Sequence, residues 1–137
     1  MSVESLFAPV TSEQSRADQV ACALATIERF TASFNARNLE GMDRCLHFPH
    51  VILSGERMEI WDHPGQMPPD FFVELERSGW DRTIYIDQRP VLVSPRKVHV
   101  VVDYTRNRAD GSIMSRHENL WIVTEQSGAW GIKQRSY

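Results

Sequence analysis

The chain has 137 residues, about the size of one ordinary domain. Hydrophobic residues make up 42% of it, enough for one sizeable core, and charged residues make up 24%, as is usual for a globular protein. The formal net charge is −3, and the basic stretches at 96–97 and 106–108 are short enough to be solvated strand ends. A nucleic-acid-binding surface needs a broader basic field, so no nucleic-acid partner is expected.

The first predicted element is a long amphipathic helix over residues 12–35, which follows a flexible arm over residues 1–11. Thr11 and Ser12 are suitable N-cap residues, and Glu13 places negative charge in the first turn, where the helix dipole favours it. Apolar residues then recur at helical spacing: Val20, Ala23, Leu24, Ile27, Phe30 and Phe34. This spacing predicts a broad buried face.

A short helix and a hairpin are expected next. Asn38 is a suitable N-cap for a helix over residues 39–46, and Pro49 ends that helix because proline does not continue it. Residues 50–61 then alternate apolar and polar positions on two arms, with Ser54–Gly55 as the turn between them. The chain is therefore expected to reverse direction soon after the second helix.

A third helix and four strands complete the prediction. Pro68 and Pro69 suit the first turn of a helix, and Gly79 ends it. Asp110–Gly111 and Ser127–Gly128 are turn signals. The strands are expected over residues 80–93, with a bulge at Arg89–Pro90, and over residues 97–106, 113–125 and 130–137.

Helices that precede a run of antiparallel strands indicate an α+β fold rather than a parallel α/β sheet. We expect a single domain over residues 12–137, in which one curved sheet carries three helices on its concave side. Such an arrangement encloses a pocket at its wide end. Small-molecule sites are usually concave and mostly apolar, so this pocket is the expected site.

Three segments carry a resemblance to a known family. They are FTASFNARNLEGMDRCL at residues 30–46, the hairpin that follows it, and LWIVTEQSGAWGIKQRSY at residues 120–137. These segments resemble the nuclear transport factor 2-like superfamily, which includes SnoaL-like and ketosteroid isomerase-like proteins. The resemblance implies a cone-shaped, mixed or antiparallel sheet, a roll of the cystatin-like type, with the helices over its concave side.

The resemblance also implies what to look for in the pocket. Isomerases of this family use a carboxylate base near the end of the first hairpin arm, where this chain has no Asp or Glu before Glu56. They also place an acidic hydrogen-bond donor on the penultimate strand, where this chain offers Asn119. Ketosteroid isomerase chemistry is therefore not expected, and a fold that hosts many activities leaves others open.

Candidate pocket residues come from the helix, the hairpin and the penultimate strand. His117, Asn119 and Trp121 share one strand face, and polar groups beside a tryptophan suit a ligand wall. The expected ligand-binding residues are Phe30, Phe34, His50, Trp61, His117, Asn119 and Trp121. If the protein is an enzyme, His50 or His117 is the expected acid–base group, because histidine titrates near neutral pH.

The strand at 97–106 separates a core face from an outer face. Val98, Val100, Val102 and Tyr104 alternate as the core face. The outer face carries Lys97, His99, Asp103 and Thr105, and we expect it to meet solvent or a second copy of the chain in a homodimer. Packing of the His117 face on a dimer partner is an open alternative.

Two classes of function remain open at this point. The first is a pocket for a small hydrophobic ligand, with or without lyase or isomerase chemistry on a pocket histidine. The second is a non-catalytic module that assembles or binds a partner through the outer sheet face. No phosphate loop or dinucleotide fingerprint indicates a cofactor, and the histidines lack a third placed metal ligand. Without a signal peptide or a membrane span, a cytoplasmic location is expected.

Overall fold

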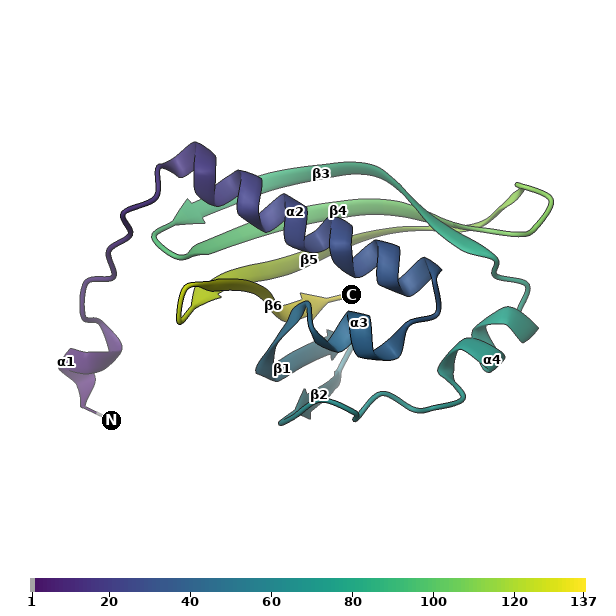
Figure 1. Ribbon diagram of the computed structural model, residues 1–137, viewed down its shortest axis with the longest axis horizontal. Coiled ribbons are helices and arrows are strands. Elements are labelled where there is room, and N and C mark those ends of the chain that lie inside the picture. Colours follow the sequence, from purple (N-terminus) through teal and green to yellow (C-terminus); the bar gives the residue numbers. More distant parts are fainter. Residues whose placement is uncertain (1) are drawn as a thin grey trace.

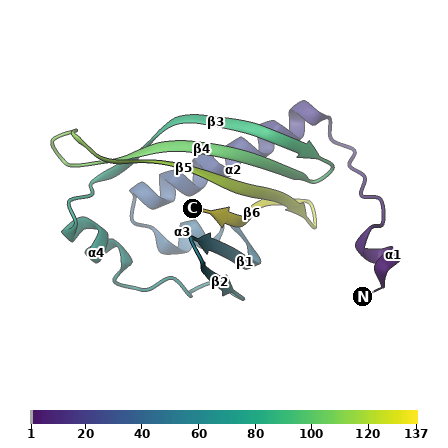
Figure 2. The ribbon, with the colours of Figure 1, turned by 180° about the vertical axis from the view of Figure 1, so that it is seen from behind.

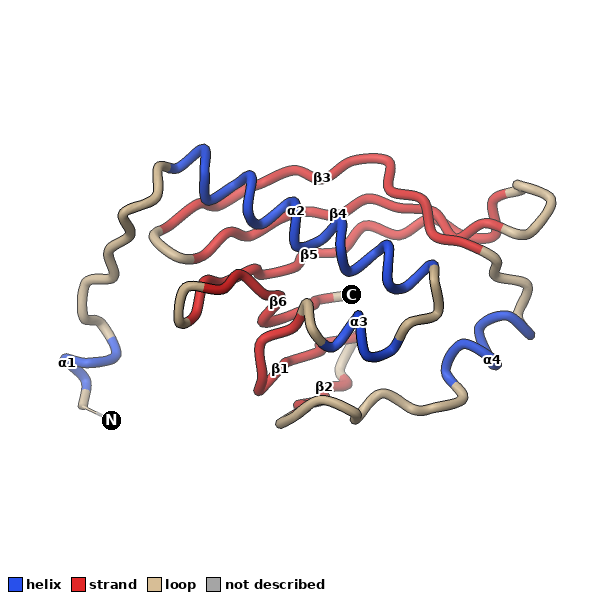
Figure 3. Tube along the Cα trace, viewed as in Figure 1, coloured by secondary structure: helices blue, strands red, loops and turns tan. Residues whose placement is uncertain are grey.

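Six strands form one curved, unclosed sheet in the computed structural model, which describes residues 2–137 (Figures 1 and 3). The strands are β1 Leu46–Ser54, β2 Arg57–Trp61, β3 Arg82–Ser94, β4 Lys97–Asn107, β5 Ile113–Gln126 and β6 Ala129–Ser136. Their order in the sheet is β2-β1-β6-β5-β4-β3, with β1 and β6 parallel and every other pair antiparallel. The expected α+β class with a mixed sheet is confirmed.

The helices are α1 Val3–Leu6, α2 Arg16–Asn35, α3 Leu39–Asp43 and α4 Phe71–Arg77. Helices α2, α3 and α4 lie on one side of this sheet, and α1 lies apart from it on the N-terminal arm (Figures 1 and 2). Figure 1 shows α2 lying diagonally across the strands, and Figure 2 shows that the opposite sheet face carries no helix among the described residues. Within residues 2–137, no helix combines the length and the apolar character that crossing a membrane requires.

The buried core lies between α2 and the middle of the sheet. Val98, Val100 and Val102 of β4 are fully buried, as their alternation predicts. They face Ala23 and Ile27 of α2, whose side chains are also fully buried. This packing is what holds the long helix over the sheet, since helices in proteins are stabilised mainly by burial of their apolar face.

The long helix begins later than the sequence predicts. Its N-cap is Ser15, whose side chain accepts a hydrogen bond from the Asp18 backbone N–H. Ser12 instead accepts from the Gln14 backbone N–H and closes a local turn before the helix. Both serines have a hydroxyl oxygen that can cap a helix, so the sequence did not show which of them is the N-cap. The predicted arm before this helix contains one helical turn, α1, with no buried side chain, and Met1 lies outside the described residues.

The second helix is shorter than predicted. Asn38 caps α3 as expected, through a hydrogen bond from the Gly41 N–H, but the helix ends at Asp43. Strand β1 begins at Leu46 and contains Pro49, which was expected only to stop the helix. The pairing of β1 with β6 shifts register between Leu46 and Val51. Pro49 lies within this irregular stretch, where no backbone N–H is required for pairing.

Proline is accommodated differently in β3, where a bulge was expected at Arg89–Pro90. Pro90 is paired with Val100, and the register shifts lie on either side of it, between Tyr85 and Asp87 and between Pro90 and Leu92. Because β3 is an edge strand, one side of its backbone has no neighbouring strand, which is where sheets tolerate proline.

Close packing joins β1 to β6 at Gly131. A Cβ atom at that position meets three ring atoms of His47 at 2.9 to 3.0 Å. The His47 ring has little freedom to move, because its Nε2 atom lies 3.1 Å from the Thr124 carbonyl oxygen and 2.9 Å from that of Ala129. Glycine is therefore required here by space.

We expect Gly131→Ala to lower the free energy of unfolding by about 1–3 kcal/mol, the usual cost of forcing an extra carbon into a packed site. Urea denaturation measures the loss. In the His47→Ala background the same change should cost clearly less, because the clashing ring is absent. Equal losses in the two backgrounds would show that the His47 ring does not set the requirement.

Candidate functional site

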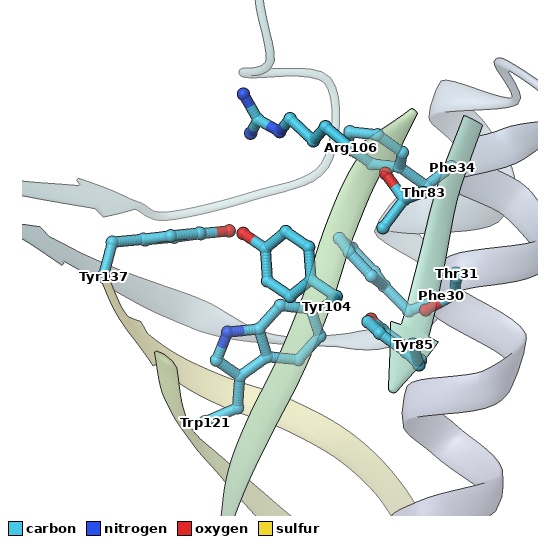
Figure 4. A pocket seen from close by; sticks show the side chains of 9 residues that line it. All are labelled: Phe30, Thr31, Phe34, Thr83, Tyr85, Tyr104, Arg106, Trp121 and Tyr137. Atoms are coloured by element: carbon cyan, nitrogen blue, oxygen red, sulfur yellow. The ribbon is translucent and has the colours of Figure 1, made fainter. Parts of the chain in front are cut away.

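Two adjoining pockets lie between the helices and the concave side of the sheet. The inner pocket is small, with a cavity volume of about 30 Å³, and is lined by Phe30, Thr31, Phe34, Thr83, Tyr85, Tyr104, Arg106, Trp121 and Tyr137 (Figure 4). The outer pocket, about 350 Å³ and partly open to solvent, has a lining that includes Ile52, Ser54, Arg57, Glu59, Trp61, Met67, Phe71 and Arg135. Both pockets are also lined by Phe34, Arg106 and Tyr137, so they lie next to one another.

Aromatic rings from α2, α4 and the sheet shape the walls of the two pockets. Phe30 and Phe34 lie one turn apart on α2 and therefore point the same way. Trp121 of β5 meets Phe30 edge-on, with ring centroids 5.4 Å apart. Phe34 meets Phe71 of α4 edge-on at 5.9 Å. Such edge-to-face pairs are favourable, so the wall is preformed by the same contacts that build the core.

Tyrosine hydroxyls supply polarity to this apolar wall. The Tyr104 hydroxyl accepts a hydrogen bond from Asn119 Nδ2 at 2.8 Å, and Figure 4 shows it directed toward the hydroxyl of Tyr137. Burial raises the pKa of Tyr104 to about 12 and also raises that of Tyr85. Both phenols are therefore neutral at physiological pH and act as hydrogen-bonding groups rather than as anions.

His50 and Arg135 form a buried pair beneath the outer pocket. His50 is fully buried, and its Nδ1 lies 2.9 Å from the Ile132 carbonyl oxygen. A carbonyl only accepts, so Nδ1 carries the proton, and Nε2 accepts the Arg135 Nε–H at 3.0 Å. Both ring nitrogens are thus occupied. Burial, and then the charge of Arg135, lower the pKa of His50 to about 3, so the ring is neutral.

Arg135 is a buried cation among aromatic rings. It is 4% exposed, and its guanidinium carbon lies 5.0 Å from the centroid of Phe30, 5.7 Å from that of Trp61 and 6.0 Å from that of Trp121. Its Nη1 donates to the Tyr137 hydroxyl at 2.9 Å. Among residues 2–137, no carboxylate lies within ion-pair distance of it.

Two further N–H groups of the lining have no partner within the described chain. Nε1 of Trp121 and Nε of Arg106 are buried without a hydrogen bond. Buried donors are usually paired, because leaving one unpaired costs about 1–3 kcal/mol. Both residues line the inner pocket, so an acceptor atom there is what these donors lack.

The structure divides the residues that the sequence singled out into two groups. Phe30, Phe34 and Trp121 line the inner pocket, and Phe34 and Trp61 line the outer one. His50 lies beneath Arg135, and Asn119 lies behind Tyr104.

His117 is outside both linings. Its ring stacks on Tyr104 with centroids 5.1 Å apart, and its Nε2 is hydrogen-bonded to Ser115 at 2.8 Å. Of the two histidines considered for proton transfer, one is therefore fully occupied and the other lies behind the pocket wall. No three His, Cys, Asp or Glu side chains of residues 2–137 gather as ligands of a metal do.

Sequence reasoning missed the charged part of the site. Arg106, Arg135 and Tyr137 were not among the expected residues. Ile132 of β6 is a core residue, and if side chains alternated strictly along the strand from there, Gln134 would point inward and Arg135 outward. The β5–β6 pairing shifts register between Ile122 and Val123, however, and this extra residue in β6 turns Arg135 inward instead. Tyr104 did carry a usable signal, because it alternates with the core valines of β4.

Comparison with solved structures reveals several proteins of similar architecture. A protein of unknown function with a cystatin-like fold from Nostoc punctiforme matches with a TM-score of 0.68 at 10% identity, over 91% of this chain and 92% of its own. A nuclear transport factor 2-like protein from Novosphingobium aromaticivorans matches with a TM-score of 0.68 at 11% identity, over 88% and 80%. No family model and no curated protein matches the sequence.

A protein from Shewanella frigidimarina that is provisionally named a ketosteroid isomerase matches with a TM-score of 0.61 at 11% identity, over 93% of this chain and 98% of its own. The expected nuclear transport factor 2-like, cystatin-like fold is thereby confirmed. At these identities the likeness concerns the fold alone, and this fold hosts unrelated functions. The function must therefore be argued from the site.

The buried state of His50 makes stability depend on pH. With a pKa of about 3 in the folded protein and 6.5 ordinarily, the unfolded chain binds a proton here that the folded chain does not, between those pH values. The contribution of His50 to stability is thus complete above pH 6.5 and is lost as the pH falls toward 3. We expect it to change the free energy of unfolding by up to about 1.4 kcal/mol per pH unit.

Urea denaturation at several pH values between 3 and 6.5 measures this slope in the wild type and in His50→Gln. The variant should lose stability less steeply as the pH falls. His99 and His117, whose pKa values are also lowered by burial, are present in both proteins, so the difference isolates His50. Parallel curves would mean that His50 is protonated in the folded protein.

Proposed function

We propose that this protein binds a small, largely apolar organic molecule in the two adjoining pockets. The observation that carries the proposal is the Nε1–H of Trp121, a donor on a residue only 3% exposed that lines the inner pocket and has no partner in the described chain. A bound acceptor atom would satisfy this donor, and the surrounding rings would bury the rest of the molecule.

The polar groups of the site support binding more than histidine chemistry. Proton transfer requires a nitrogen within reach of the substrate, and both nitrogens of His50 are already bonded. Glu59 is the carboxylate of the outer lining, and it is bonded to Arg57 at 2.9 Å. We therefore propose a ligand-binding role as primary, with the lyase or isomerase alternative resting on a group other than His50 or His117.

Trp121 allows the proposal to be tested by removing a single N–H. We expect Trp121→Phe to weaken binding of 2-naphthoate, an aromatic probe with acceptor oxygens, by about threefold to tenfold, because one hydrogen bond is lost while an aromatic ring is kept. Titration calorimetry measures the affinity.

Trp130→Phe is the matched control, because the Trp130 Nε1–H is already bonded to Gln14 at 3.0 Å and Trp130 is not part of either lining. The affinity of the Trp130→Phe variant for 2-naphthoate should equal that of the wild type. Equal weakening by both changes would assign the effect to general loss of packing and contradict the role of the Trp121 N–H.

We also propose that the uncovered sheet face is the interface of a homodimer. Strand registers place Val51 and Leu53 of β1, Met58 and Ile60 of β2, and Leu120 and Ile122 of β5 on this face. Of these, Met58 is 62% exposed and Ile60 is 49% exposed. An apolar sheet face of this kind is typical of an association surface.

The polar residues expected on this face need a correction. Asp103 is only 6% exposed, because Arg116 of the neighbouring strand covers it with hydrogen bonds of 3.1 and 2.7 Å. Thr105 is buried as well and donates to Asn107. Asp103 is therefore paired within its own chain, which leaves the apolar residues as the support for an interface.

Leu120→Lys tests the dimer, because it places a charge at the centre of that face. We expect the wild type to sediment at twice the 15.8 kDa protomer mass and the variant to sediment as the protomer. Val73→Lys on α4 is the control, since Val73 is 56% exposed away from the sheet, and it should remain a dimer. A wild type that sediments as the protomer would contradict the proposal.

A further inference from the structure

The charges of the outer pocket do not balance. Its lining contains three arginines, Arg57, Arg106 and Arg135, and one carboxylate, that of Glu59. Glu59 is bonded to Arg57. Neither Arg106 nor Arg135 has an ion-pair partner among residues 2–137. The site therefore holds two guanidinium groups whose positive charge is not compensated by the described chain.

Arg135 is the more costly of the two, because it is nearly fully buried. A buried charge is strongly unfavourable unless it is paired. The neutral ring of His50, the Tyr137 hydroxyl and the faces of four aromatic rings compensate part of that cost. All of these groups are neutral, so the positive charge of Arg135 has no counter-ion among them.

The geometry leaves room for that counter-ion. A guanidinium has five N–H groups, and Arg135 uses one on Nε for His50 and one on Nη1 for Tyr137. No acceptor within residues 2–137 is bonded to Nη2, and Arg135 lines the outer pocket. The His50 contact orients the guanidinium, since it holds Nε against β1 while Nη2 keeps its N–H groups for a ligand.

We infer that the molecule bound in this site is an organic acid, whose carboxylate pairs with Arg135 and whose apolar body lies in the outer pocket against its aromatic rings. The inference rests on the proposed function and specifies its ligand class. Carboxylates suit the planar fork of a guanidinium, and the desolvated setting strengthens the pair. Arg106 lines both pockets and supplies a second positive charge to the same anion.

The size and lining of the site favour a carboxylate on a compact ring or short chain. The outer pocket has a cavity volume of about 350 Å³, the inner one adds about 30 Å³, and aromatic rings line both. Trp121 and Arg106, whose buried N–H groups have no partner among the described residues, both line the inner pocket, where acceptor oxygens of a ligand would meet them. A cationic ligand would instead bring a second positive charge next to a buried guanidinium, which disfavours it.

The test compares probes that differ only in charge. We would measure the binding of 2-naphthoate, 2-naphthamide and 2-naphthylmethylammonium, and of the corresponding smaller benzene series, by titration calorimetry and thermal unfolding. The acid of each series should bind more than about tenfold tighter than its amide, and the ammonium should bind most weakly. Equal affinity of acid and amide overturns the inference but leaves the proposed function intact. Absence of binding by every probe contradicts the proposed function itself.

Charge-removing variants locate the anion. Arg135→Gln should reduce the affinity for 2-naphthoate by more than about tenfold and change that for 2-naphthamide by less than about twofold. Arg106→Gln should reduce the affinity for the acid in the same direction, and it remains informative if Arg135→Gln does not fold. Arg44→Gln is the matched control, because it removes one exposed positive charge far from the lining and should leave both affinities unchanged. Loss of acid binding in Arg44→Gln equal to that in the other two would show that net charge, not the site, attracts the acid.

Discussion

The hydrogen bond from Arg135 to His50 is the contact on which the character of this site depends. It joins β6 to β1, the one parallel pair of the sheet, and lies beneath the outer pocket. Because the Ile132 carbonyl fixes the proton on the opposite ring nitrogen, His50 presents a lone pair to the guanidinium. The pair therefore carries a single positive charge, and that charge belongs to Arg135.

The same side chains build the core and the site. Phe34 packs edge-on against Trp80, with centroids 5.3 Å apart, and also lines both pockets. Trp121 is part of the buried core, lines the inner pocket and has an unpartnered N–H. A preformed wall of this kind lowers the entropic cost of binding, because its side chains are already ordered before a ligand arrives. The general fold is common to proteins of different function, and the buried arginine is what gives this pocket its own chemistry.

Local periodicity explains what could be predicted. The valines of β4 and the apolar stripe of α2 were assigned correctly, because alternation and helical spacing depend only on neighbouring residues. Asn38 was recognised as a cap for the same reason. Ser15 was missed as the cap of α2, since Thr11 and Ser12 offer equivalent oxygens earlier in the chain. Phe30, Phe34, Trp61 and Trp121 were predicted to line the pocket from helical spacing and strand alternation, together with the resemblance of their segments to the nuclear transport factor 2-like superfamily.

The sequence by itself determined the order of the elements, the fold class and four aromatic residues of the pocket walls, Phe30, Phe34, Trp61 and Trp121, because these follow from patterns within each element. Only the tertiary structure decided the charge of the pocket. A single extra residue in β6 turns Arg135 inward, and pairing between strands that are distant in sequence brings it onto His50. A bulge leaves no periodic signal of its own, and the pairing of β1 with β6 spans more than 80 residues of chain, as the 82-residue separation of His50 and Ile132 shows.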